Sequence, residues 1–162
     1  PHPGPPEGHG HGRSKAARLM VDRRLVDRQL AVVIRGSGCM KIPLRRGDIV
    51  DVNLAGALGG EKQNDATSGG RPCVVVQNQT GNDHSPLTII APLTDTAQFK
   101  HLPVQVLVTA AELGFKGSKD SVVECGHVRT IDRDTRIRSH LGSIQPEALA
   151  RIDAALRVSL GL

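Results

Sequence analysis

Five short apolar runs, separated by turn-forming residues, constrain the fold of this chain more than any other feature. They cover residues 47–54, 72–77, 87–93, 102–108 and 121–131. Runs of this length that are rich in Val and Ile, and that are bounded by Gly, Pro, Asn or Asp, are typical of β-strands. Gly126 interrupts the last run and indicates a β-bulge. The pattern predicts a mainly β domain.

Helical signals complete the predicted architecture. One helical turn is expected over residues 109–114, and Pro146 suits the first position of a helix that closes the chain. An apolar stripe at helical spacing follows, formed by Leu149, Ile152, Leu156 and Leu160. We expect a small antiparallel barrel with peripheral helices, because closing a sheet on itself removes its exposed edges.

Residues 1–40 differ in composition from residues 41–162, which we expect to form the folded domain. The first twelve residues are Pro, Gly and His with one Glu, a composition typical of disordered segments. A helical apolar pattern follows over residues 14–34. The sequence alone leaves open whether this N-terminal extension is a functional segment, a leader or a tag.

The basic charge is concentrated outside the predicted domain. The net charge is +5, and residues 1–40 hold seven Lys or Arg against three acids, whereas residues 41–162 hold fourteen against thirteen. A basic site in the domain must therefore be local. Phe99 and Phe115 are the only aromatic residues. Without an aromatic platform for stacking bases, recognition of single-stranded nucleic acid would depend on hydrogen bonds.

Missing signatures exclude several classes of protein. No apolar run reaches the roughly 20 residues that cross a bilayer, and we expect no membrane partner. The sequence has no zinc-ligand spacing, P-loop, GxSxG or paired catalytic carboxylates, so we expect no metal or cofactor. Cys39, Cys73 and Cys125 have no paired spacing. An odd count without CxxC fits a reducing compartment, and we expect the protein in the cytoplasm.

Seven segments occur in a recognisable order. They are RRGDIVDVNL (45–54), GRPCVVVQNQTGNDHSP (70–86), IIAPLT (89–94), LPVQV (102–106), KDSVV (119–123), VRTID (128–132) and DAALRVSLGL (153–162). In order and approximate spacing they resemble the MazF/PemK toxins, the endoribonucleases of toxin–antitoxin pairs. The resemblance covers about residues 44–162.

The resemblance implies an SH3-like barrel that works as a homodimer. Such a toxin cuts single-stranded RNA, including mRNA, at short sequences without a metal. It is inhibited by a cognate MazE-like antitoxin whose flexible acidic tail covers the RNA groove. The family's catalytic arginine and threonine match Arg71 and Thr94 here. An arginine fork suits phosphate oxygens, and a threonine hydroxyl can donate a further hydrogen bond.

The resemblance also implies which residues bind RNA. The segment GGEK (59–62) resembles the family's G-S-E-Q, which makes Gly60, Glu61 and Lys62 candidate contacts to bases or phosphates. Asn78 resembles an asparagine that contacts RNA in the family. A solvated loop is the alternative for residues 59–62, and a turn residue is the alternative for Asn78.

One segment departs from the family pattern. The family usually has C-E-Q before V-R-T-I-D, with Glu and Gln contacting bases, whereas this chain has Cys125, Gly126 and His127. The missing carboxylate removes an acceptor for base amino groups, so the RNA target sequence stays open. His127 is suited to stack on a base or carry a proton near neutral pH. A solvent-facing histidine is the alternative, and His84 and His101 are further candidates.

The loop over residues 55–70 is longer than in the family. Its additional residues, near 64–70, add conformational freedom, so we expect the loop to be poorly ordered without RNA or antitoxin. Two other functions stay open at this point. The gyrase poison CcdB shares the barrel without cutting RNA, and a toxin with a decayed active site would only bind its antitoxin.

Overall fold

The computed structural model describes Pro1, Gly4 and residues 42–162. The helix predicted over residues 14–34 and the expected domain boundary between residues 40 and 41 lie outside the described residues. None of the described helices is long and apolar enough to cross a membrane.

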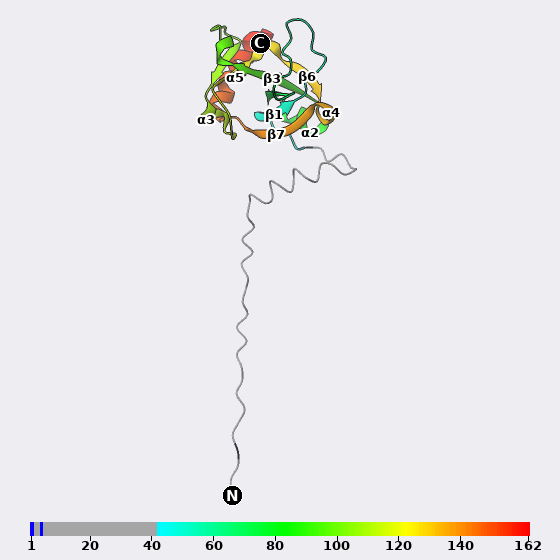
Figure 1. Ribbon diagram of the computed structural model, residues 1–162, viewed down its shortest axis with the longest axis vertical. Helices are drawn as coiled ribbons and strands as arrows, with labels where there is room; N and C mark the ends of the chain where they lie inside the picture. The colour runs from blue at the N-terminus through cyan, green and yellow to red at the C-terminus, as the bar shows by residue number, and fades with distance from the viewer. Residues whose placement is uncertain (2–3, 5–41) are drawn as a thin grey trace. The chain divides into compact units, whose positions relative to one another are not determined.

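The described part of the chain is mainly β, as predicted, and ends in a helix (Figure 1). The strands are β1 (Asp48–Val52), β2 (Arg71–Val75), β3 (Leu87–Asp95), β4 (Gln105–Val108), β5 (Ser121–Glu124), β6 (Arg129–Asp132) and β7 (Ile137–Ser143). The helices are α2 (Gln79–His84), α3 (Ala110–Leu113), α4 (Arg133–Arg136) and α5 (Pro146–Leu160), with 3₁₀ turns η1 (Thr96–Gln98) and η2 (Cys125–His127).

Four of the five predicted runs each overlap one strand, but the interpretation of residues 121–131 as a single strand is wrong. This run forms β5 and β6, and η2 separates them at Gly126. The sequence analysis missed β7, an edge strand that pairs only with β1 among the described strands. Its sequence IRSHLGS is polar because most of its side chains reach solvent, so it lacks the apolar alternation of a half-buried strand.

The strands follow the order β4-β5-β3-β2-β1-β7, and β6 pairs with β3. The nine-residue strand β3 is shared, because its first half pairs with β2 and β6 and its last three residues pair with β5. Among the described strands the hydrogen-bonded path is open, with β4 and β7 at its ends. α5 packs against β4, and Arg151 Nη2 donates to the Leu107 carbonyl at 3.1 Å.

Two apolar clusters form on the two faces of the strands, because successive strand residues point to opposite sides. The larger cluster joins the strands to α3 and α5 and includes Ile49, Val74, Ala91, Leu113 and Ile152. The smaller cluster includes Leu44, Val50, Cys73, Val75 and Ile90. With so few aromatic residues, the core consists of aliphatic side chains and two buried cysteines. This packing holds the starts and ends of β2, β3, β5 and β6 in fixed positions.

Candidate active site

Arg71 lies at the first position of β2, and the glycine before it has a structural reason. Gly70 is buried, and a Cβ there would lie only 2.4 Å from Asp51 Oδ1 and 2.5 Å from Arg138 Nη1. A larger residue at this position would push the ends of the Asp51 and Arg138 side chains aside, so glycine lets both approach the backbone. It brings the chain into β2 with the Arg71 side chain at the strand entrance.

The Arg71 guanidinium is held between the long loop and β3. Its Nε donates to the Gln63 carbonyl, and its Nη1 donates to the Leu93 carbonyl at 2.9 Å. A guanidinium carries five N–H donors. These two bonds leave three donors for another ligand, and the residue is half-buried.

Thr94 lies near Arg71. The antiparallel pairing of β2 with β3 begins at Cys73 and Pro92, and at Thr94 itself β3 pairs with Val122 of β5. The carbonyl that binds Arg71 belongs to Leu93, the residue directly before Thr94. The two predicted catalytic residues are therefore neighbours.

Two carboxylates near these residues are poor proton acceptors. The pKa of Asp65 is lowered, chiefly by hydrogen bonds from the backbone N–H groups of Ser68 and Thr67. The pKa of Asp95 is also lowered, first by the backbone N–H of Ala97 and then by Lys119, whose Nζ lies 2.6 Å from Asp95 Oδ2. Both carboxylates stay ionised at neutral pH, so they balance the local positive charge.

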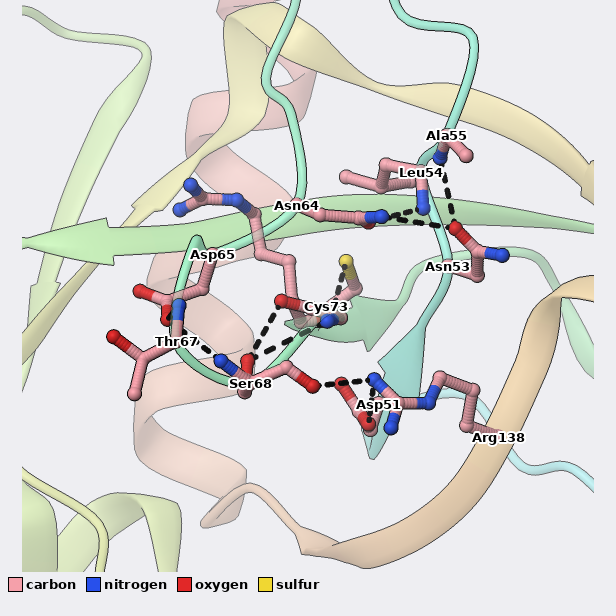
Figure 2. A network of polar contacts seen from close by, with 12 residues as sticks. Asp51, Asn53, Leu54, Ala55, Asn64, Asp65, Thr67, Ser68, Cys73 and Arg138 are labelled. Carbon is pink, nitrogen blue, oxygen red and sulfur yellow. Dashed lines mark hydrogen bonds and ion pairs between the residues drawn. The ribbon is translucent and has the colours of Figure 1, made fainter.

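Hydrogen bonds tie the long loop to the end of β1 (Figure 2). Asn64 Nδ2 donates to Asn53 Oδ1 at 2.9 Å, and the backbone N–H of Leu54 donates to Asn64 Oδ1 at 2.6 Å. The Asn53 side chain also accepts from the backbone of Ala55 at 2.9 Å. These bonds hold Asn64, the residue directly after Arg71's partner Gln63, against the end of β1.

A second network anchors the additional residues of the loop (Figure 2). Asp65 Oδ1 accepts from the backbone N–H groups of Thr67 and Ser68 at 2.9 and 3.1 Å. Arg138 on β7 donates to the Ser68 carbonyl at 2.9 Å and lies 3.4 Å from Asp51. The predicted disorder of this loop stays a prediction, and these bonds identify the contacts that would have to break.

A cavity of about 310 Å³ opens beside the loop. Its walls are apolar on one side, from Leu54, Ile90, Pro92 and Val128. The remaining lining residues come from the loop and from the segment that joins β5 to β6: Gly60, Glu61, Lys62, Gly126, His127 and Arg129. Four of the five predicted RNA-binding residues therefore meet in one place. Arg71 is adjacent, because its two carbonyl partners follow Lys62 and Pro92 in the sequence.

Lys62 is paired within the protein. Its Nζ lies 3.2 Å from Glu124 Oε1, and Gln105 Nε2 donates to both Glu124 oxygens at 3.2 and 3.3 Å. The Glu124 side chain is only 7% exposed, and that of Lys62 is 20% exposed. The ion pair fastens the loop to the end of β5.

Arg129 faces Glu61 across the same cavity. Its Nη1 lies 3.9 Å from Glu61 Oε2, too far for a hydrogen bond. Among the described residues, no group accepts a hydrogen bond from this buried Nη1 atom. Arg129 therefore has an N–H donor without an acceptor in the described part of the chain, and the Glu61 carboxylate lies beside it but too far away to accept a hydrogen bond.

Asn78 is not part of this cavity. It caps the N-terminus of α2, and its Oδ1 accepts from the Gly81 N–H at 2.7 Å. It lines a larger groove of about 700 Å³ that runs along α5 and includes Leu156, Leu160 and Leu162. The structure therefore separates Asn78 from the other predicted RNA-binding residues.

The three histidines that the sequence analysis named are all exposed, whereas another histidine, His140, pairs with a carboxylate. His84 and His101 lie on the surface, and the ring of His101 packs 4.4 Å from Phe99. His140 on β7 lies 3.4 Å from the buried Asp48 carboxylate. The hydrogen bond that the His140 ring donates to the Asp48 carboxylate raises the pKa of His140, although partial burial opposes the shift.

Sequence reasoning missed Glu124 and Arg129. Glu124 follows three apolar or small residues in a strand where all four side chains are buried, and an acid in such a run is a usable signal, because buried carboxylates need partners. In the sequence, Arg129 stands out only as part of the VRTID segment. Its role depends on the cavity, which the sequence does not display.

The chain was compared with known protein families and structures. A family model described as the PemK-like, MazF-like toxin of type II toxin–antitoxin systems matches residues 45–160. This chain belongs to that family. Endoribonuclease EndoA of Bacillus subtilis (strain 168) is 34% identical to this toxin over 119 residues, which are 74% of this chain and 96% of EndoA.

Solved structures share the fold of this toxin. The crystal structure of MazF (Form-I) from Deinococcus radiodurans matches with a TM-score of 0.59 at 23% identity, covering 75% of this chain and all of that one. An endoribonuclease in complex with its cognate antitoxin from Mycobacterial species matches with a TM-score of 0.57 at 21% identity, covering 74% and 96% of the two chains. The predicted mainly β fold with a C-terminal helix, as in the MazF structures, is thereby confirmed, although the described strands do not close into the expected barrel, because β4 and β7 stay at the ends of the hydrogen-bonded path.

Proposed function

We propose that this toxin is an endoribonuclease that cuts single-stranded RNA, including mRNA, at short sequences without a metal. The observation that carries the proposal is the Arg71 guanidinium, bound to the carbonyl directly before Thr94, beside a cavity with polar and apolar lining residues. The name of the relative EndoA, at 34% identity, favours this function over that of a CcdB-like gyrase poison.

The reaction uses the RNA itself as nucleophile. The ribose 2′-oxygen attacks the neighbouring phosphorus as its proton leaves, the bond from phosphorus to the 5′-oxygen breaks, and that oxygen gains a proton. The products are a 2′,3′-cyclic phosphate and a 5′-hydroxyl. Binding the chain in the extended geometry that aligns these atoms lowers the barrier, because the attack is intramolecular.

Arg71 stabilises the charge that develops on the phosphate. Its three free N–H donors form a planar fork that matches two phosphate oxygens, and the two bonds to backbone carbonyls fix its orientation before the substrate binds. Thr94 donates its hydroxyl to another phosphate oxygen. Positioned donors of this kind act where charge appears in the transition state.

The other predicted residues bind the RNA on either side of the cut. Gly60 and Glu61 contact a base, His127 is exposed and lines the same cavity, and Lys62 adds positive charge while it pairs with Glu124. Asn78 would contact a more distant part of the RNA, because it lines the other groove.

The partners follow from the family. We propose that a cognate MazE-like antitoxin inhibits this toxin by placing an acidic flexible tail near Arg71, and the solved Mycobacterial endoribonuclease in complex with its cognate antitoxin supports an antitoxin as partner. We also propose a homodimer formed through the groove along α5, where the apolar side chains of Leu160 and Leu162 are 58% and 87% exposed. The cytoplasm is the proposed location, because Cys73 and Cys125 are both free.

Cleavage of a long unstructured RNA in EDTA tests the proposal. We expect fragments whose 3′ ends carry a cyclic phosphate and whose 5′ ends carry a hydroxyl, which end-labelling with polynucleotide kinase detects. Intact RNA combined with inhibition of DNA gyrase would support the CcdB-like alternative instead. Cleavage that requires an added divalent ion would contradict the metal-independent mechanism.

A further inference from the structure

We propose that the cavity beside Arg71 binds a guanine base, with Glu61 and Arg129 as the residues that determine specificity. This inference rests on the proposed function, because it names a base that the cleaved RNA must contain. It assigns a role to Arg129, which the catalytic mechanism does not use.

The size and walls of the cavity suit one flat base. Its volume of about 310 Å³ lies at the lower end of the range of about 300–1,000 Å³ for ligand pockets. Leu54, Ile90 and Pro92 provide apolar surface for the face of the ring. Glu61 and Arg129 also line the cavity and carry the groups that can bind the edge of the base.

Nη1 of Arg129 has no hydrogen-bond acceptor in the part of the chain that the structure describes, and a bound base could provide one. Its buried Nη1 has no hydrogen-bond partner among the described residues, and leaving a buried donor unpaired costs about 1–3 kcal/mol. Its guanidinium would regain this energy by donating to acceptors on a base. Arginine prefers O6 and N7 of guanine, which accept both of its parallel N–H groups.

Glu61 is held where it can accept from the same base. Its Oε2 accepts from the backbone N–H of Leu58 at 3.0 Å, and it lies 3.9 Å from Arg129 Nη1. The next residue, Lys62, is fixed by Glu124. The carboxylate therefore stays beside the guanidinium, with lone pairs left for a ligand.

Guanine is the base whose edges match this arrangement. Moving around its ring, two acceptors, N7 and O6, are followed by two donors, the N1–H and N2–H₂ groups. Adenine alternates acceptor, donor and acceptor, uracil does the same, and cytosine has one donor next to two acceptors. Only guanine lets Arg129 and Glu61 both bind through two bonds while they lie side by side.

The Glu61 carboxylate also disfavours an acidic side chain on Arg129, so the acidic antitoxin tail proposed above would bind at Arg71 and not on Arg129. A carboxylate placed on Arg129 would lie next to the Glu61 carboxylate, and like charges at short range repel. The carboxylate instead favours a ligand that carries both donors and acceptors on one edge, as a base does.

The experiment has two steps and uses the full chain. Sequencing of the cut ends from a randomised RNA pool first identifies the cleavage site, where we expect guanine at one fixed position. Synthetic RNAs then carry adenine, cytosine, uracil, inosine or 7-deazaguanine at that position. Inosine lacks the N2 amino group, and 7-deazaguanine lacks the N7 acceptor. We expect each analogue to reduce kcat/KM about 5- to 100-fold.

Variants assign each contact to a side chain. In E61Q the penalty for inosine should shrink, because the amide no longer offers two acceptors, whereas the penalty for 7-deazaguanine should persist. In R129M the pattern should reverse. Matched controls are E147Q and R45M, which alter exposed residues outside the cavity and should keep both penalties at the wild-type values.

Three results would overturn the inference. Equal cleavage with all four bases, a fixed base other than guanine, or unchanged analogue penalties in E61Q and R129M would each contradict it while leaving the endoribonuclease function intact. A wild-type protein that cuts no RNA would remove the proposed function together with the inference.

Discussion

The cavity beside Arg71 and the groove along α5 are neighbours that differ in their lining residues. They share Val128 and Arg129, but the cavity includes Glu61 and His127, whereas the groove includes three leucines among its polar residues: Leu156, Leu160 and Leu162. Strand β3 divides them, since Ile90 lines the cavity and Ile89 lines the groove. The alternation of strand side chains is the cause.

The difference shows how one small domain can serve two kinds of partner. A polar hollow with an unpaired donor selects by hydrogen bonds, which suits an RNA base. An apolar groove gains from removing surface from water, which suits a protein. If this division is correct, changes in one region should affect cleavage and changes in the other should affect assembly.

The largest effect is expected from R71A, at the cavity side. Loss of the fixed cation should reduce kcat for RNA cleavage by about 100- to 1,000-fold, as removal of one positioned donor does in other enzymes. The sedimentation behaviour should stay that of wild type. R45M is the control, because Arg45 is exposed and away from the cavity. Undiminished cleavage by R71A would remove this residue from the mechanism.

The second largest effect is expected from the ion pair of Lys62 with Glu124, which holds the loop against β5. E124A should lower the free energy of unfolding by about 2–4 kcal/mol, because Lys62 would be left partly buried without its partner. Replacing both charges, as in K62M/E124L, should recover stability to within about 1 kcal/mol of wild type. Urea unfolding followed by circular dichroism measures both. A double variant no more stable than E124A would show that the pair itself is not the cause.

At the groove side, L160D should weaken the proposed dimer. Each copy would lose about 1.5–3 kcal/mol of apolar burial, so the dissociation constant should rise at least about 100-fold in a two-fold dimer. Analytical ultracentrifugation measures this. L58D is the matched control, because Leu58 is also exposed but lies on the loop. Equal dissociation of both variants would contradict an interface along α5.

The smallest expected effect is a pH dependence of stability that comes from His140, a residue outside both the cavity and the groove. Since the pKa of His140 is raised by Asp48, its stabilising effect is complete below its unfolded value of about 6.5 and is lost as the pH rises through the folded value. We expect less than about 1 kcal/mol, because His140 is more than a third exposed. Urea midpoints between pH 6 and 9 should decline less in H140Q than in wild type. H84Q should follow wild type, because His84 is exposed.

The fold was predictable where local patterns agreed with burial. The runs that overlap β1 to β4 and the stripe of α5 have the periods of the faces they bury, so the sequence displays them. Two elements were not predictable for opposite reasons. β7 is a polar edge strand whose pairing depends on β1, and α2 has the sequence QTGNDH, in which no apolar stripe marks a helix.

The candidate site was predictable only in part. Motif order predicted Arg71, Thr94 and the loop segment Gly60 to Lys62, and Arg71 bonds to the carbonyls of Gln63 and Leu93, the neighbours of Lys62 and Thr94. The same reasoning grouped Asn78 with them, whereas it caps α2 and faces the other groove. Distance in the sequence does not indicate which face of a strand or which end of a helix a residue reaches.

The sequence by itself determined that this chain is a mainly β toxin of the MazF-like family with an arginine at the entrance to β2. Only the tertiary structure decided what surrounds that arginine. The pairing of Lys62 with Glu124 and the approach of Arg129 to Glu61 join residues about 60 positions apart. Local patterns record which residues are buried, but contacts between distant segments arise only when the strands pack.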